Sequence, residues 1–200
     1  KFGSLPGMWE RTITVGSIGK MLGITGWKLG WVTGPKDLIR DVWLVHQFIP
    51  FVANTPLQEA AGRALEAVFE DIEKNGEENG FFHKTRKQYE ELRDDMQIML
   101  EEVNLSPIKP HGGYFTIANI SNIPEPKGEL YEHEFRDYRI CKSLTIDGGV
   151  TTIPLSPFYL NKEDKVKHAS NGVRFAFCKD PKFISDAGVA LKSYFKKLNK

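Results

Sequence analysis

The residues with the clearest chemical potential lie in one short glycine-rich segment near the start of the chain. Ser17 stands three residues before Lys20, and Lys28 stands eight residues after it. A lysine amine condenses with an aldehyde to form an imine, so Lys20 can hold an aldehyde-bearing cofactor covalently. The Ser17 hydroxyl can donate a hydrogen bond to a phosphate, and the Lys28 ammonium can neutralise it. The spacing therefore favours a cofactor that carries both an aldehyde and a phosphate.

Two other phosphate-binding loops do not fit this segment. A Walker A loop, G-x-x-x-x-G-K-[ST], would need a glycine where Thr14 stands and a hydroxyl where Met21 stands. A dinucleotide-binding fingerprint would need G-x-G-x-x-G between a strand and a helix, and the segment lacks that spacing. The sequence therefore argues against a P-loop or a dinucleotide-binding turn here.

The segment resembles the cofactor-lysine segment of fold-type I pyridoxal 5'-phosphate (PLP) aminotransferases, which reads S-x-x-K followed by T-G-x-K-x-G. The resemblance extends over the whole chain. It is most specific for the subgroup of kynurenine aminotransferase, glutamine transaminase K and cysteine-S-conjugate β-lyase. The stretches that carry it are 4–12 (SLPGMWERT), 25–31 (TGWKLGW), 45–47 (VHQ), 113–115 (GYF), 153–154 (IP), 158–159 (FY) and 173–175 (VRF).

This resemblance implies a role for five residues. Lys20 would carry PLP and, once released from it, would move the proton of the transamination, while Ser17 and Lys28 would hold the phosphate. Arg174 would bind the substrate carboxylate, because its planar fork matches a planar carboxylate. Phe51 would line the partner subunit's pocket in a homodimer. The implied reaction moves an amino group from an amino acid, such as kynurenine or glutamine, to a 2-oxo acid.

The residues taken alone also allow plainer interpretations. Lys20 can be a solvated loop lysine, Ser17 a turn or helix cap, and Lys28 a surface residue of a strand. In the alternating segment 173–178, Arg174 lies on the face opposite the three large apolar residues. An arginine in that position can bind a ligand or simply face solvent.

Two other functions remain open at this point. A cysteine-S-conjugate β-lyase shares the early steps of transamination and differs in releasing pyruvate. Some transcription regulators carry an aminotransferase-like domain that senses an effector without turning it over. A DNA-binding segment outside these 200 residues would favour that second alternative.

Composition limits the partners and the compartment. The 27 basic and 26 acidic residues leave a formal net charge of +1, which predicts no nucleic-acid or membrane binding. No stretch approaches the roughly 20 apolar residues that span a bilayer. Two cysteines without paired spacing and five histidines without ligand spacing predict neither a disulfide nor a metal site. A cytoplasmic location is the default, and a mitochondrial one stays open because the chain starts at Lys1 rather than Met.

The hydrophobic pattern predicts an α/β fold. The resemblance further implies that residues 1–75 are the end of a fold-type I large domain and that residues 76–200 form a small C-terminal α+β domain. A cap at Thr55 should begin a helix that Pro56 and Gln58 support. We expect strands at 11–15, 27–33, 113–120 and 173–178, and helices at 36–47, 55–74, 82–103, 131–144 and 181–198.

The family to which this sequence is similar has longer members on the N-terminal side. We therefore expect this chain to be a C-terminal portion. The preceding part would supply the groups that contact the cofactor ring, including the acid that pairs with its nitrogen. Without that part Lys20 has an amine but no complete electron sink, so the isolated 200 residues should be inactive.

Overall fold

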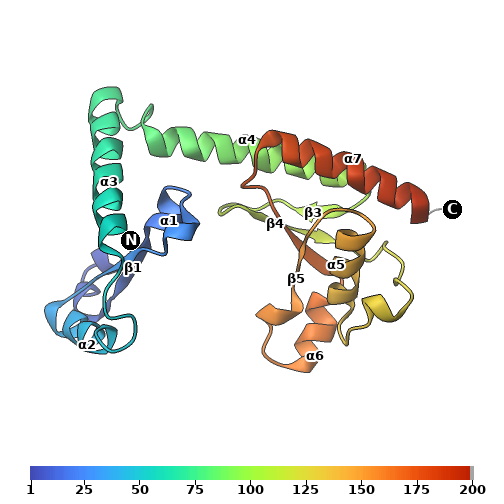
Figure 1. The fold of residues 1–200 in the computed structure, drawn as a ribbon, viewed down its shortest axis with the longest axis horizontal. Helices are drawn as coiled ribbons and strands as arrows, with labels where there is room; N and C mark the ends of the chain where they lie inside the picture. Colours follow the sequence, from blue (N-terminus) through green and yellow to red (C-terminus); the bar gives the residue numbers. More distant parts are fainter. Residues whose placement is uncertain (199–200) are drawn as a thin grey trace. The chain divides into compact units, whose positions relative to one another are not determined.

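The computed structural model describes residues 1–198, and the chain divides into two compact units. The first unit runs from Lys1 to Phe81, and the second begins at Phe82. Each has its own hydrophobic cluster. The α/β content expected from the sequence is confirmed, since both units mix helices with antiparallel strands (Figure 1).

A two-stranded antiparallel hairpin organises the first unit. Strand β1 (Thr14–Ser17) pairs with β2 (Gly30–Thr33), with Thr14 opposite Thr33 and Ser17 opposite Gly30. The pairing depends on Gly16, because a Cβ there would lie 2.2 Å from Cε2 of Trp31. The short helix α1 (Ile18–Met21) and a 3-10 turn, η3 (Thr25–Trp27), lie between the strands.

The two strands are shorter than the sequence pattern predicts. The expected strand at 11–15 is wrong in its first half, because Trp9–Arg11 forms a 3-10 turn that the Thr12 N–H closes on the Trp9 carbonyl. The expected strand at 27–33 is also wrong at its start. Lys28 has a left-handed backbone (φ 56°), which ends a β ladder, so β2 begins only at Gly30.

Two helices follow the hairpin, α2 (Lys36–His46) and α3 (Thr55–Asn75). Both confirm the predicted helices, but the cap of α3 differs. The Oδ1 atom of Asn54, not the Thr55 hydroxyl, accepts a hydrogen bond from the Leu57 N–H at 3.2 Å. The Gln58 side chain reaches back to the Ala53 carbonyl at 2.8 Å. Asn is among the strongest N-cap residues, and the cap therefore lies at Asn54, one residue earlier than predicted.

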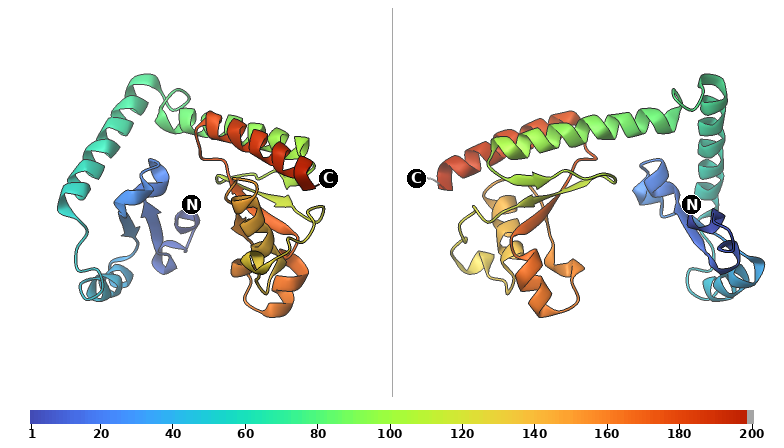
Figure 2. Two further views of the ribbon diagram at one scale, coloured as in Figure 1. Left: turned by 45° about the vertical axis from the view of Figure 1, so that its right-hand side comes forward. Right: turned by 180° about the vertical axis from the view of Figure 1, so that it is seen from behind.

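The second unit contains a four-stranded antiparallel sheet in the order β3-β4-β6-β5. In Figures 1 and 2 the two long helices, α4 and α7, run side by side over this unit. The remaining bounds are α4 (Phe81–Glu102), β3 (Ser106–Ile108), β4 (Phe115–Asn119), α5 (Arg136–Ile146), β5 (Ile153–Pro154), α6 (Lys162–Asp164), β6 (Gly172–Ala176) and α7 (Pro181–Leu198).

Most of these elements agree with the sequence. The helices predicted at 82–103 and 181–198 and the strands predicted at 113–120 and 173–178 are confirmed to within about two residues. Helix α5 begins at Arg136 rather than 131, because Glu129–Tyr131 forms a separate 3-10 turn. The pattern misses β3 and β5, which are three and two residues long and contain a proline each.

Within residues 1–198, the helices α4, α5 and α7 pack against one face of this sheet, and the other, less buried face is called the bare face below. Thr116 and Ala118 of β4 and Val173 and Phe175 of β6 are buried. They lie in or against a core to which α4, α5 and α7 contribute Leu100, Leu144 and Leu191. The alternate residues, such as Ile117 and Arg174, point to the opposite face and are less buried. A one-sided antiparallel sheet is a common arrangement, and here its bare face carries Arg174.

We predict that Leu100→Ala destabilises the second unit. Leu100 is 0% exposed, so truncation removes buried apolar contacts and leaves a cavity, which lowers the free energy of unfolding by about 2–5 kcal/mol. Leu160→Ala is the control, because Leu160 is 101% exposed and its truncation should change stability by less than about 0.5 kcal/mol. Denaturant unfolding measures both, and equal effects would contradict the described core.

Candidate active site

Lys20 lies on the short helix α1, directly after strand β1. Ile18, two residues earlier, is 1% exposed and anchors this helix in the core of the first unit. The Ile18 N–H donates to the Leu29 carbonyl at 3.2 Å, which ties the helix to the segment that leads into β2. Lys20 itself is exposed. Lys20 is therefore exposed on a helix whose backbone is fixed by the buried Ile18 side chain and by the Ile18–Leu29 hydrogen bond.

Gly19 allows a close approach of the chain to this lysine. A Cβ at position 19 would lie 3.0 Å from Cα of Thr25 and 3.3 Å from the Ile24 carbonyl oxygen, both backbone atoms. The Thr25 hydroxyl donates to the Gly19 carbonyl at 3.2 Å. The turn after α1 therefore closes against the residue next to Lys20, and a larger side chain would force it open.

Ser17 and Lys28 lie at the same end of the hairpin as Lys20. Ser17 pairs with Gly30, two residues beyond Lys28. Ser17 occupies the N-cap position of α1, yet its side chain makes no capping hydrogen bond, so the plain capping role is not observed. The backbone brings the three predicted positions into one small region.

Lys28 differs from its predicted setting. We expected it on a strand, but it follows η3 with a left-handed backbone (φ 56°, ψ 34°). It is exposed and forms no ion pair with another described residue. A left-handed conformation costs a non-glycine residue free energy, and such residues are enriched at ligand sites. The strain is consistent with a functional position for this cation.

Phe51 also has a left-handed backbone, at φ 64°, which is unusual for a bulky side chain. Its N–H donates to the His46 carbonyl at 3.1 Å, and its side chain is 76% exposed. Phe48, Ile49 and Val52 are exposed beside it in the sequence. This stretch of exposed apolar side chains is typical of a surface that another polypeptide covers.

Arg174 lies on β6, opposite Ile117 of β4 and Ile153 of β5. Its guanidinium carbon is 4.0 Å from the ring centroid of Phe115 and 4.8 Å from that of Phe158. Its Nε atom is buried without a hydrogen-bond partner in the described chain. Aromatic contacts stabilise the cation but leave its N–H donors unused. Among the described residues the guanidinium thus contacts aromatic rings and forms no ion pair.

The sequence did not assign a role to Phe115 or Phe158. Phe115 pairs with Ala176, two residues from Arg174, so strand register alone would have placed it near the guanidinium. Phe158 belongs to the 3-10 turn η5 (Ser156–Phe158), and no periodic pattern reveals that its ring reaches Arg174. Both rings occur in stretches that carry the family resemblance.

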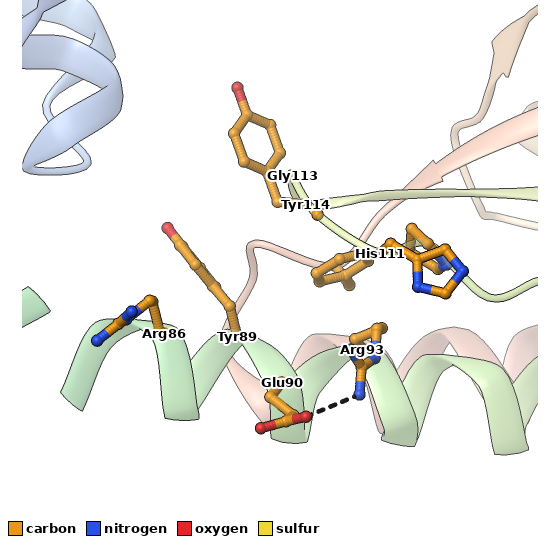
Figure 3. A pocket seen from close by; sticks show the side chains of 10 residues that line it. Arg86, Tyr89, Glu90, Arg93, His111, Gly113 and Tyr114 are labelled. Carbon is orange, nitrogen blue, oxygen red and sulfur yellow. Dashed lines mark hydrogen bonds and ion pairs between the residues drawn. The ribbon is translucent and has the colours of Figure 1, made fainter. Parts of the chain in front are cut away.

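A cavity of about 500 Å³ lies in the second unit between α4 and the loop before β4. Figure 3 shows Arg86, Tyr89 and Arg93 on the helix and His111 and Tyr114 on the loop, with Arg93 paired to Glu90. Burial, followed by the nearby Cys178 and Tyr114, raises the pKa of Tyr89. The phenol therefore stays protonated near neutral pH.

The cysteines, the possible metal ligands and the long helices complete the description of groups that could carry a function. Burial raises the pKa of the Cys141 thiol to about 11, so it stays protonated and unreactive, and Cys178 is unpaired. Within residues 1–198 no group of three or more His, Cys, Asp or Glu side chains is placed to hold a metal ion. None of the helices in that range is long and apolar enough to cross a bilayer.

The sequence matches the family described as aminotransferase class I and II over residues 5–182. Kynurenine–oxoglutarate transaminase 3 of Homo sapiens is 39% identical over 194 residues, covering 97% of this chain and 42% of the relative. Kynurenine–oxoglutarate transaminase of Dictyostelium discoideum is 40% identical over 188 residues, covering 90% and 41%. Among solved structures, Bna3p of Saccharomyces cerevisiae superposes with a TM-score of 0.80 at 33% identity, covering 96% of this chain and 44% of that one.

These similarities define a class of protein. The chain belongs to the class I and II aminotransferase family and adopts part of the fold-type I architecture. N-Succinyldiaminopimelate aminotransferase of Mycobacterium tuberculosis, at TM-score 0.76 and 29% identity, has the same arrangement over 96% of this chain. The chain spans about two fifths of the length of the curated relatives it matches.

We predict that Lys28→Gly stabilises the first unit. Glycine adopts a left-handed backbone without steric cost, and this gain should exceed its entropic penalty by roughly 0.5 kcal/mol. Arg40→Gly, at an exposed position within α2, is the control and should lower stability by about 1 kcal/mol. Thermal or denaturant unfolding measures both. If Lys28→Gly lowers the free energy of unfolding as much as Arg40→Gly does, Lys28 does not have the left-handed backbone conformation.

Proposed function

We propose that this chain is the C-terminal portion of a PLP-dependent aminotransferase. Residues 1–75 would end the cofactor-binding large domain, and residues 76–200 would form the small α+β domain. The observation that carries the proposal is the gathering of Ser17, Lys20 and Lys28 at one end of the β1–β2 hairpin. The similarity to kynurenine–oxoglutarate transaminases supports the same activity.

The residues at this end of the hairpin suit PLP. The turn closes tightly on Gly19, which fixes the backbone beside Lys20. Ser17 has a hydroxyl that does not cap the helix, and Lys28 has an exposed ammonium without an ion-pair partner in the described chain. A phosphate with two negative charges needs such a donor and such a cation.

Each residue would then have a distinct task. The Lys20 Nζ would attach the cofactor and, after substrate displaces it, carry the proton taken from the substrate α-carbon. Ser17 would donate a hydrogen bond to the phosphate and Lys28 would neutralise it. When bound, PLP supplies the electron sink that makes the α-proton acidic.

Arg174 would bind the α-carboxylate of the amino acid and of the oxo acid. Its aromatic neighbours, Phe115 and Phe158, restrict the guanidinium and keep water from part of it. A bidentate ion pair in such a partly dry place is stronger than one in water. Because both substrates carry this carboxylate, one arginine serves both halves of the reaction.

Two features concern the substrate and the assembly. We propose kynurenine or glutamine as amino donor and a 2-oxo acid as acceptor, because the relatives are kynurenine–oxoglutarate transaminases. We further propose a homodimer in which Phe51 enters the partner's pocket. Its exposed aromatic ring and the apolar residues around it support this arrangement.

The activity can be tested directly. Whole protein loaded with PLP should convert kynurenine only when a 2-oxo acid is present, and it should form the matching amino acid. Cysteine S-conjugates serve as the comparison, because β-elimination releases pyruvate without an oxo acid. Pyruvate release without oxo-acid-dependent transfer would replace the transaminase proposal with the lyase.

Arg174→Lys should raise KM for amino and oxo acids about ten- to a hundredfold, with little loss of folding or PLP binding. The reason is that a point charge replaces a bidentate fork. Arg63→Lys is the control, because its guanidinium is exposed and, among the described residues, pairs with Glu59 of the same helix. Steady-state kinetics with both substrates gives the result. Unchanged KM values in Arg174→Lys would contradict the proposal that Arg174 binds the substrate carboxylate.

Lys28→Gln should weaken PLP retention about ten- to a hundredfold, because a charge-assisted contact of roughly 1.5–3 kcal/mol is lost. The attachment chemistry of Lys20 should persist at saturating PLP. Equilibrium dialysis followed by absorbance measures retention, with Lys36→Gln on the surface of α2 as the matched control. Retention equal to that of the control would place Lys28 outside the phosphate site.

A further inference from the structure

Asp137 is a buried carboxylate that none of the steps above uses. It is 0% exposed and stands second in helix α5. Its Oδ1 accepts a hydrogen bond from the Tyr138 N–H at 3.0 Å, and its Oδ2 accepts one from the Ser156 N–H at 2.6 Å. Burying a charge is costly unless hydrogen bonds compensate, and here two backbone donors do so. The bond to Ser156 joins α5 to a segment 19 residues away.

The Ser156 end of this bond begins the turn η5 (Ser156–Phe158). The preceding strand β5 contains only Ile153 and Pro154, and Pro154 has no N–H to donate to the ladder. The Ser156 hydroxyl is buried and has no hydrogen-bond partner in the described chain, so the turn is held at this residue through its backbone. The carboxylate of Asp137 is therefore a polar anchor of this weakly paired edge, together with Cys141 of the same helix, whose Sγ accepts a hydrogen bond from the Thr152 hydroxyl at 3.1 Å.

The other end of the turn reaches the bare face of the sheet. Phe158 is its last residue, and its ring centroid lies 4.8 Å from the guanidinium carbon of Arg174. Ile153, at the start of the same segment, pairs directly with Arg174. Asp137 sits on the covered side, yet the segment that it holds lies beside Arg174.

We propose that Asp137 is a positioning residue for the carboxylate site. By holding the Ser156 N–H it fixes the turn that places Phe158 over Arg174, and so it orients the guanidinium toward the substrate carboxylate. The inference rests on the proposed aminotransferase function. Asp137 itself does not touch substrate or cofactor.

Asp137→Asn is the first test in the whole protein. The amide keeps the shape of the side chain but offers one acceptor to two backbone donors, so one hydrogen bond is lost. KM for both amino acid and oxo acid should rise about tenfold, while kcat changes by less than about threefold. Asp137→Ser, whose hydroxyl is too short to reach Ser156, should give the same rise or a larger one and serves if the Asn variant fails to fold.

Ser143→Ala is the matched control for lost stability. Ser143 is also buried on α5, and its hydroxyl lies 2.9 Å from both Asp147 Oδ2 and Tyr194 Oη. Its removal should lower the unfolding midpoint without changing either KM. Hydrogen exchange should accelerate at residues 152–159 in Asp137→Asn and stay unchanged there in Ser143→Ala.

A double-mutant cycle tests whether Asp137 acts through Phe158. Phe158→Leu removes the ring that contacts Arg174 and should raise KM by itself. Combined with Asp137→Asn, it should raise KM no further than the larger single effect, because both changes remove the same contact. Additive effects, or an Asp137→Asn variant with wild-type KM, would overturn the proposal.

The outcome separates this inference from the function on which it rests. If the wild type transaminates and Arg174→Lys raises KM while Asp137→Asn does not, only the positioning role fails. If the wild type does not transaminate, or Arg174→Lys has unchanged KM values, the carboxylate site fails and the role of Asp137 falls with it.

Discussion

The antiparallel pairing of β1 with β2 decides where the proposed cofactor-binding residues lie. Ser17 ends one strand opposite Gly30, and this register brings Lys28 to the end of the hairpin where α1 carries Lys20. The pairing requires Gly30, because a Cβ there would lie 2.7 Å from the Gly16 carbonyl oxygen. The backbone positions of a cation, a hydroxyl and an amine, which lie within residues 17–28 of the sequence, are thus found at one end of the hairpin.

Arg174, the residue proposed to bind the substrate carboxylate, depends on a different constraint, the one-sided sheet of the second unit. Alternation along β6 buries Val173 and Phe175 and leaves Arg174 on the bare face. There two aromatic rings, rather than acids, stabilise the guanidinium. An acidic neighbour would compete with a substrate carboxylate, whereas aromatic neighbours do not. The packing of the unit therefore fixes the position of Arg174 and leaves its Nε–H donor without a partner in the described chain.

The sequence predicts the features that local patterns control. The apolar spacing of α4 and α7 and the alternation around Arg174 are both observed. The sequence does not predict features that depend on residues far away along the chain. Strand β5 exists only because β6 pairs with it, and the left-handed Lys28 follows from closure of the turn before β2. The contact of Phe158 with Arg174 depends on a buried hydrogen bond from a separate helix, which no local propensity encodes.

The central claim is that Lys20 carries PLP, and chemical trapping tests it most directly. Whole protein loaded with PLP is reduced with borohydride, digested, and analysed by mass spectrometry for the lysine that bears the pyridoxyl group. The account predicts modification at Lys20, and its loss from this segment in Lys20→Ala. Reduction that labels another lysine in the wild type, or labels this segment equally in Lys20→Ala, would contradict it.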